Sequence, residues 1–351
     1  MTTQTSNPVT LTGLGWQPFF QQQLTLDEIG VLTPCRVVEQ YRNEVELAGE
    51  SGKHQLALLS SMPQMVVGDW LLLNAAGGFE RLLDRSTCFR RIAAGHQKQE
   101  QLIAANVDTA FIVCSLNDDF NLNRLERYLA MVHDAGAEPV VVLSKKDLAE
   151  NADELAAQVQ SLSALLAVVA VNALEETTKQ VLIPWCRPGQ TIVMLGSSGA
   201  GKSTLTNTLM GEQRQATAEI RSDDSKGRHT TTARSLFPMA GGAMLLDTPG
   251  MRELQLVDMQ AGVATTFADI EELATQCRFN DCQHHSEPGC AVQAAIAADE
   301  LDERRLLNYE KLMREQAMNA ATIAQKRASA KNLGKFYKKT LDQSVRNKRG
   351  E

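Results

Sequence analysis

The chain has 351 residues, of which 43% are hydrophobic and 22% are charged, as is typical of an ordinary soluble protein. This length allows two or three domains, each with its own core. No apolar run is long enough to cross a bilayer, and the first ten residues carry no secretion signal. We therefore expect a cytoplasmic protein without a membrane partner, and we also expect a monomer.

The formal net charge of −7 at pH 7 argues against nucleic-acid binding over the whole surface, but the charge is unevenly distributed. Residues 326–351 hold nine basic and two acidic residues, a net charge of +7, so the rest of the chain carries −14. A basic tail on an acidic body favours a polyanionic partner. The alternative is a tail that is merely solvated.

The first hundred residues divide into a polar arm and a strand-rich segment. Residues 1–30 are rich in Gln and show little pattern, so we expect a loosely ordered arm. Residues 31–100 hold short apolar runs between turn-forming residues, which predicts a small antiparallel β-barrel of the OB or SH3-like kind, with Trp70 in its packing. The five predicted strands cover residues 35–38, 44–47, 55–59, 65–73 and 79–83.

Residues 101–256 alternate between strands and helices, which predicts a parallel sheet with helices on both faces. The whole chain is therefore predicted to be a multidomain α/β protein. The long polar segment 211–232 is interpreted as a functional loop. Strands are predicted at residues 107–115, 139–143, 167–172, 191–195, 233–239 and 243–246, and helices at residues 122–135, 153–166, 174–185 and 203–210.

The sequence GSSGAGKS at residues 196–203 fits the phosphate-binding loop of nucleotide hydrolases. It lies between a predicted strand and a predicted helix, where backbone N–H groups and the helix N-terminus can bind phosphate oxygens. Lys202 would reach the β- and γ-phosphates, and the Ser203 hydroxyl would bind Mg²⁺. The alternative is a Gly/Ser-rich linker that matches by chance.

Two further elements follow this loop. Asp247 ends a strand in the sequence DTPG, where it would hold Mg²⁺ directly or through water, and the Gly250 N–H would face the γ-phosphate. Between the two lies GRHTTT at residues 227–232, in which Thr231 or Thr232 would close over Mg²⁺ as a switch. The sequence does not separate these two threonines.

A base-reading element precedes the loop. In Ser144-Lys145-Lys146-Asp147, the aspartate would accept two hydrogen bonds from guanine, and the stretch containing Asn172 and Ala173 would offer an N–H to the guanine carbonyl. A serine replaces the usual Asn or Thr as the first residue. Base-reading elements ordinarily follow the phosphate loop, so their position before it predicts a circularly permuted GTPase domain.

Cys277, Cys282, His284 and Cys290 lie within fourteen residues and match a closed, structural Zn²⁺ site. His285 is a spare candidate ligand. The alternative is three free cysteines in a loop. Helices predicted at residues 265–275 and 291–325 flank the cluster, which gives a helical zinc-binding domain at residues 257–325 before the basic tail.

The motif order SKKD, GSSGAGKS, GRHTTT, DTPG and Cys-x4-Cys-x-His-x5-Cys resembles the ribosome small-subunit-dependent GTPases of the RsgA or YjeQ family. AANVD at residues 104–108 and GDWLLL at residues 68–73 resemble it too, and the resemblance covers about residues 31–320. It implies an N-terminal OB-fold, a central permuted GTPase domain, a C-terminal zinc domain, and a role in late maturation of the small ribosomal subunit, whose particle and rRNA are the implied partners.

The resemblance also places GTP and the structural zinc ion on residues of this chain. The zinc ligands carry over to the Cys3His cluster. The GTP-binding positions carry over to Ser144, Lys145, Lys146, Asp147, Gly196, Ser197, Ser198, Gly199, Ala200, Gly201, Lys202, Ser203 and Thr204.

The expected reaction is attack of water on the γ-phosphate of GTP, with Lys202, Mg²⁺ and backbone donors stabilising the charge. Met251 follows DTPG, and a methionine cannot orient water by hydrogen bonding. We therefore expect slow intrinsic turnover, with His229 or a partner completing the site. Two alternatives are an ATP-specific P-loop hydrolase or kinase, and a zinc-stabilised RNA-binding scaffold whose nucleotide is structural.

Overall fold

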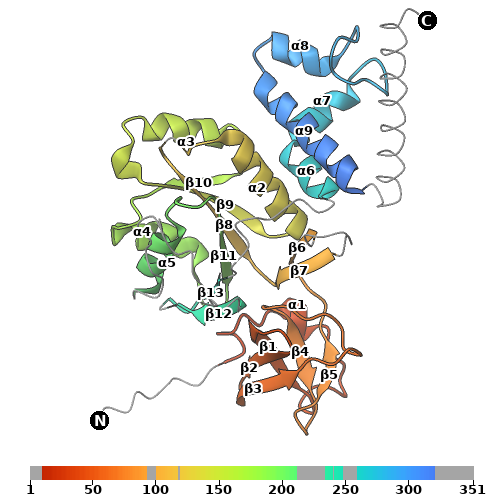
Figure 1. Cartoon of the computed structure of the whole chain (residues 1–351), viewed down its shortest axis with the longest axis vertical. Coiled ribbons are helices and arrows are strands. Elements are labelled where there is room, and N and C mark those ends of the chain that lie inside the picture. Colours follow the sequence, from red (N-terminus) through yellow and green to blue (C-terminus); the bar gives the residue numbers. More distant parts are fainter. Residues whose placement is uncertain are drawn as a thin grey trace, which may run out of the picture.

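A computed structural model describes residues 10–92, 100–117, 119–211, 234–239, 241–247 and 259–320 of the chain. Figure 1 shows three parts along the long axis of the molecule: a group of N-terminal strands, a central sheet covered by helices, and a group of C-terminal helices. This is the mixed α/β content that the sequence predicts.

The N-terminal strands form an antiparallel sheet. β1 pairs with β2 and β4, β2 also pairs with β3, and β4 also pairs with β5. Trp70 is fully buried, as predicted. Among the described strands no pairing joins β3 to β5, so the closed OB or SH3-like barrel stays a prediction. The strands are β1 (Thr33–Gln40), β2 (Glu44–Gly49), β3 (Gly52–Ala57), β4 (Trp70–Leu73) and β5 (Phe79–Leu82).

The expectation of a loosely ordered arm at residues 1–30 is wrong for residues 10–30. Helix α1 (Pro18–Gln21) places Phe20 against Trp70, with 5.8 Å between ring centroids, and leaves Phe20 only 1% exposed. Further along, Arg81 bonds Glu28 at 2.7 Å and lowers the pKa of that carboxyl from 4.5 to about 2. These aromatic and ionic contacts come from residues far along the chain, so the local composition did not reveal them.

The central sheet has the order β10-β9-β8-β11-β13-β12, in which β12 alone is antiparallel to its neighbour β13. In the sheet, β11 pairs on one side with β8, the first parallel strand of this region in the sequence. On its other side β11 pairs with β13, the last parallel strand. The strands are β8 (Thr109–Ser115), β9 (Glu138–Ser144), β10 (Ala167–Ala170), β11 (Thr191–Leu195), β12 (Arg234–Pro238) and β13 (Met244–Asp247).

Two hydrophobic cores cover the two faces of this sheet. On β8, Ile112 packs in the core that contains α2 and α3, whereas the neighbouring Phe111 packs in the core that contains α4 and α5. The predicted helix at residues 174–185 is shorter, and Pro184 lies in a 3₁₀ turn after it because proline lacks the N–H that a longer helix requires. The helices are α2 (Leu122–Ala135), α3 (Ala152–Gln160), α4 (Thr177–Leu182) and α5 (Lys202–Met210).

The N-terminal and central parts share one continuous sheet. β12 pairs with β1, with Ser235 opposite Glu39 and Arg234 opposite Gln40. A further antiparallel pair, β6 (Cys88–Ile92) and β7 (Glu100–Ala105), was not predicted. β7 also runs across the boundary expected between residues 100 and 101, so the chain continues as a strand at that point.

The C-terminal helices pack around a third hydrophobic core, which includes Phe267 and Leu312 together with Ala130 and Met131 of α2. The predicted helix at residues 265–275 is two helices that meet at Phe267. The predicted helix at 291–325 is also two over its described residues, 291–320. Asp299, with a left-handed φ of 56°, separates the latter pair because an α-helix needs a negative φ. The helices are α6 (Gln260–Thr266), α7 (Ala268–Thr275), α8 (Ala291–Ala297) and α9 (Glu303–Ala320).

Helix α2 carries the contact between the central sheet and the C-terminal helices. A Cβ atom on Gly262 of α6 would lie 2.0 Å from the Ala130 carbonyl oxygen of α2, so only glycine permits this crossing. The carboxylate of Glu126, which is fully buried on α2, accepts hydrogen bonds from Arg305 at 2.8 Å and Asn308 at 2.5 Å. Helix α9 is thus bound to α2 by a buried ionic contact.

No described helix combines the length and apolar character of a bilayer-spanning segment.

Candidate functional site

The predicted nucleotide-binding residues gather at one edge of the central sheet. β8, β9, β10, β11 and β13 are parallel, so their carboxyl ends meet at this edge. Ser144 ends β9, Asn172 follows β10, Gly196 follows β11, and Asp247 ends β13. Open α/β sheets bind their ligands at this edge. The segments that the sequence predicts to bind base, phosphate and Mg²⁺ are therefore neighbours.

The phosphate-loop sequence forms the predicted turn between strand and helix. β11 ends at Leu195 and α5 begins at Lys202. Gly196 has a φ of 138°, and a Cβ atom there would lie 2.1 Å from the Val113 carbonyl oxygen of β8, so only glycine fits. Ser198 and Gly199 are exposed to solvent at the outer part of the loop. Such a loop at a helix N-terminus presents backbone donors to an anion.

Lys202 is held against the loop. Its Nζ donates to the carbonyl oxygens of Gly196, at 2.8 Å, and of Ser197. Ser203 and Thr204 are half-buried in the first turn of α5. The cation and the Ser203 hydroxyl thus lie at the end of the helix where phosphates would bind.

Ser144 connects the base-reading segment to the phosphate loop. Its hydroxyl donates a hydrogen bond of 2.6 Å to the Ala200 carbonyl oxygen, and the side chain is fully buried. Serine therefore supplies a supporting contact at the position where the sequence departs from the usual Asn or Thr.

The two segments that the sequence predicts to read the base lie side by side. Lys146 N–H donates to the Val171 carbonyl oxygen at 3.2 Å, and the Ala173 carbonyl oxygen accepts from Thr208 of α5 at 2.6 Å. An open pocket of about 400 Å³ lies between the segments, lined by Lys146 and Asp147 on one side and Asn172 on the other. Asp147 is exposed at this pocket and available to a ligand, and Lys145 is half-buried behind it.

Asp247 is half-buried at the end of β13, one residue beyond Leu246, which pairs with Val193 of the loop-bearing strand β11. This places its carboxylate on the strand adjacent to the phosphate loop, as the Mg²⁺ prediction requires. The other predicted switch and catalytic residues, His229, Thr231, Thr232 and Gly250, lie outside the described residues, as does Met251.

Asp119 is a site residue that the sequence did not predict. The turn after β8 places its carboxylate beside the phosphate loop, where Oδ2 accepts a hydrogen bond from the Ser197 hydroxyl. Its Oδ1 is 2.7 Å from Nη2 of Arg124, in the first turn of α2. The available signal was the polar run NDDFN directly after a buried strand, at the same sheet edge as the phosphate loop.

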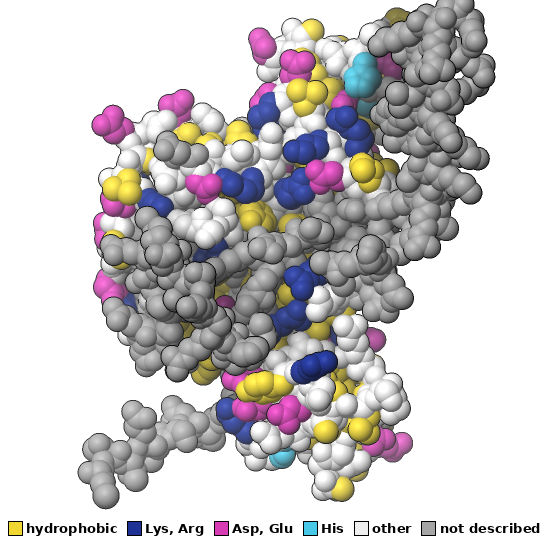
Figure 2. All heavy atoms as spheres, viewed as in Figure 1, with side chains coloured by type: hydrophobic (Ala, Val, Ile, Leu, Met, Phe, Trp, Pro, Cys, Tyr) yellow, Lys and Arg dark blue, Asp and Glu magenta, His cyan; other side chains and the backbone are white. Residues whose placement is uncertain are grey.

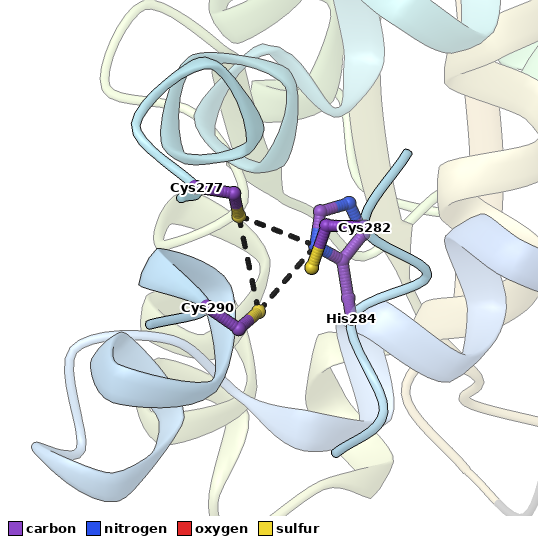
Figure 3. A group of neighbouring side chains, drawn as sticks. All are labelled: Cys277, Cys282, His284 and Cys290. Carbon is purple, nitrogen blue, oxygen red and sulfur yellow. Dashed lines mark hydrogen bonds between the residues drawn. The ribbon is translucent and has the colours of Figure 1, made fainter. Parts of the chain in front are cut away.

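The four predicted metal ligands converge in the C-terminal part, as Figure 3 shows. Their ligand atoms all lie within 4.8 Å of one another. His284 Nδ1 is 3.6 Å from Cys277 Sγ and 3.5 Å from Cys290 Sγ, and those two sulfurs are 3.9 Å apart. A tetrahedral zinc ion spaces its sulfur and nitrogen ligands by roughly 3.5 to 3.8 Å. Cys277, Cys282, His284 and Cys290 thus fit a four-coordinate metal ion.

The spare histidine is directed elsewhere. His285 Nδ1 lies 3.7 Å from the Glu310 carboxylate of α9 and is outside the cluster. The loop itself is held by Glu287, whose carboxylate accepts from the backbone N–H groups of Gln283, at 2.8 Å, and His285, at 3.0 Å. These bonds lower the pKa of Glu287 to about 2. His284 is therefore the histidine that completes the cluster.

The sequence matches the RsgA GTPase family over residues 82–257. A curated protein from Vibrio parahaemolyticus, Small ribosomal subunit biogenesis GTPase RsgA 2, is 56% identical over 337 residues, which cover 96% of this chain and 94% of that protein.

Two solved structures share the fold. YjeQ from Thermotoga maritima aligns with a TM-score of 0.60 at 23% identity, over 82% of this chain and 99% of that chain. YloQ, described as a circularly permuted GTPase, aligns with a TM-score of 0.60 at 20% identity, over 85% of this chain and 100% of that chain. The rotated order of motifs along the central sheet thus has a structural precedent.

Proposed function

Because the chain belongs to the RsgA GTPase family, we propose that it hydrolyses GTP to GDP and phosphate during biogenesis of the small ribosomal subunit. The hydrogen bond from Ser144 to the Ala200 carbonyl carries this proposal, since it joins the segment predicted to read guanine to the predicted phosphate loop. The name of the Vibrio parahaemolyticus relative supplies the ribosomal part of the proposal.

GTP is proposed to lie along the sheet edge, with its base in the pocket beside Asp147 and its phosphates over the loop. A carboxylate at Asp147 matches the two adjacent donors of guanine and repels the ring acceptor of adenine. Lys202 and the loop N–H groups would stabilise the charge that develops on the γ-phosphate. The base-binding and phosphate-binding residues are proposed to be residues 144–147, 172–173 and 196–204.

Mg²⁺ is proposed to bind with the nucleotide at Ser203 and Asp247, where it would neutralise charge on the β- and γ-phosphates. Thr231 or Thr232 would complete this site, and the Gly250 N–H would face the γ-phosphate. Because Met251 cannot orient water, His229 or a group from the ribosomal particle would do so. Slow intrinsic hydrolysis and stimulation by the particle follow from this assignment.

The Cys3His cluster is proposed to hold one structural zinc ion, because four sulfur and nitrogen ligands leave no open position for water. The N-terminal antiparallel sheet is proposed to be an OB-fold. We further propose that the protein is a cytoplasmic monomer.

Ribosomal RNA is the proposed polyanionic partner. Residues 326–351 carry a net charge of +7. Figure 2 shows Lys and Arg side chains gathered along the middle of one face, from the C-terminal helices to the N-terminal strands. Contact between these residues and phosphate groups would give binding that weakens with added salt.

Co-sedimentation with purified small ribosomal subunits tests this proposal. We expect the protein to sediment with the particle more strongly in a non-hydrolysable GTP analogue than in GDP, and Lys202→Ala to lose this difference. Equal sedimentation in both nucleotides, with normal binding by Lys202→Ala, would favour the RNA-binding scaffold. Preference for adenine nucleotides would favour the ATP-specific enzyme.

A further inference from the structure

Asp119 contacts Ser197, a residue of the phosphate loop that also contacts Lys202. The Ser197 hydroxyl donates to Asp119 Oδ2, while the Ser197 backbone carbonyl accepts from Lys202 Nζ. A hydrogen bond to an ionised acceptor is about twice as strong as a neutral one. The position of Ser197, and with it one of the two carbonyl groups that hold Lys202, therefore depends on a carboxylate in the turn that follows the neighbouring strand β8.

The carboxylate of Asp119 is itself held in place. Oδ1 lies 2.7 Å from Nη2 of Arg124, and the Asp119 N–H donates to the Asn117 side chain at 3.1 Å. Asn121, the N-cap of α2, accepts from the Arg124 N–H at 3.0 Å and fixes the helix end that carries the guanidinium. Asp119 is thus oriented by a turn and by a helix cap, both outside the phosphate loop.

A negative charge beside an anion site would ordinarily weaken binding of the anion. The Arg124 guanidinium offsets the charge of Asp119, with both side chains about one-third exposed. The pair can therefore supply a strong hydrogen-bond acceptor to Ser197 without adding net negative charge near the phosphates.

We infer that Asp119, through Ser197, is a positioning residue that holds the phosphate loop and Lys202 in the arrangement that binds nucleotide. The inference rests on the proposed GTPase function. When the loop is already ordered in the free protein, nucleotide binding loses less free energy in ordering it, and the affinity is higher. The contribution of Asp119 is to affinity for GDP and GTP alike, since the loop binds both.

The test measures equilibrium binding of GDP and of a non-hydrolysable GTP analogue, together with steady-state GTP hydrolysis, by the full-length chain. Asp119→Ala should raise both dissociation constants roughly tenfold and change kcat at saturating GTP by less than about twofold. Asp119→Asn keeps an acceptor for Ser197 and should lose roughly threefold in affinity. Glu154→Ala, which removes an exposed carboxylate on α3, is the matched control and should bind as the wild type does.

A double-mutant cycle separates positioning from general damage. Ser197→Ala should weaken binding as much as Asp119→Ala, and the double variant should be no weaker than either. Wild-type affinity in Asp119→Ala, or losses that multiply in the double variant, would overturn the inference while leaving the proposed function intact. Failure of the wild-type chain to bind guanine nucleotides would overturn both.

Discussion

The Ser144 hydroxyl donates a hydrogen bond of 2.6 Å to the Ala200 carbonyl oxygen, across 56 positions of the sequence. Both residues are fully buried, so water does not compete for this bond. It fixes the distance between the segment that we propose reads the base and the loop that we propose binds phosphate. A nucleotide has both groups in one molecule, and its affinity therefore depends on that distance.

Removal of this hydroxyl should weaken nucleotide binding and reduce stability. Ser144→Ala leaves the buried Ala200 carbonyl without its partner, a loss of about 1–3 kcal/mol in the free energy of unfolding. We also expect the free energy of GTP binding to weaken by a similar amount, which lowers GTP affinity roughly tenfold. Urea unfolding and equilibrium binding measure the two effects. Ser163→Ala, at an exposed serine of the same domain, should change neither, and wild-type affinity in Ser144→Ala would contradict the prediction.

Asp147 should determine which base is bound. Asp147→Asn replaces one acceptor by an amide donor, so guanine loses a hydrogen bond while xanthine, with a carbonyl at the same position, gains one. We expect GDP affinity to fall at least roughly tenfold and XDP affinity to rise. Competition binding with GDP, XDP and ADP measures the change. Asp153→Asn, a nearby exposed carboxylate, should keep the preference for GDP, and an unchanged base preference in Asp147→Asn would remove Asp147 from base recognition.

The Cys3His cluster should hold one zinc ion per chain, and removal of that ion should unfold the C-terminal helices. Cys277 and Cys290 belong to the hydrophobic cluster of these helices, so the metal site and the core support each other. Cys290→Ser should lose zinc, measured by elemental analysis, together with helical circular dichroism.

His285→Ala is the matched control for the metal site, because its imidazole faces Glu310 outside the cluster. This variant should retain one equivalent of zinc, whereas His284→Ala should not. Zinc loss in His285→Ala with retention in His284→Ala would reverse the ligand assignment.

The buried contact between Glu126 and Arg305 should hold the C-terminal helices on α2. Glu126→Ala leaves Arg305, whose side chain is only 7% exposed, without one of its counterions, and breaking a buried pair costs about 3–5 kcal/mol. Glu315→Ala breaks the half-exposed pair with Arg127 on the same two helices and should cost about 0–1 kcal/mol. Guanidinium unfolding compares the two, and equal losses would contradict the assignment.

Local motifs were predictable from the sequence because each is encoded by consecutive residues. The phosphate loop from Gly196 to Ser203 requires only a strand, a glycine-rich turn and a helix, and the structure has all three. The cysteine and histidine spacing likewise predicted the cluster that the structure brings together. The resemblance to the RsgA family followed from the order of such motifs, and it is confirmed.

Contacts between distant residues were not predictable in the same way. The run NDDFN after a buried strand could have placed Asp119 at the sheet edge of the phosphate loop, but it does not indicate the contact with Ser197. That contact exists only because β8 and β11 are neighbours. The local sequence predicts a loose arm around Phe20 because its partner, Trp70, lies 50 positions away. The break at Asp299 was also missed, because the alanine-rich sequence around it favours a continuous helix.

The rate of GTP hydrolysis with and without small ribosomal subunits tests the central claim most directly. We expect slow hydrolysis by the protein alone, a large stimulation by small subunits, and loss of both activities in Lys202→Ala. Large subunits serve as the control particle and should not stimulate. A rate that small subunits leave unchanged, in a preparation that binds GTP, would contradict the claim that this chain is a GTPase of small-subunit biogenesis.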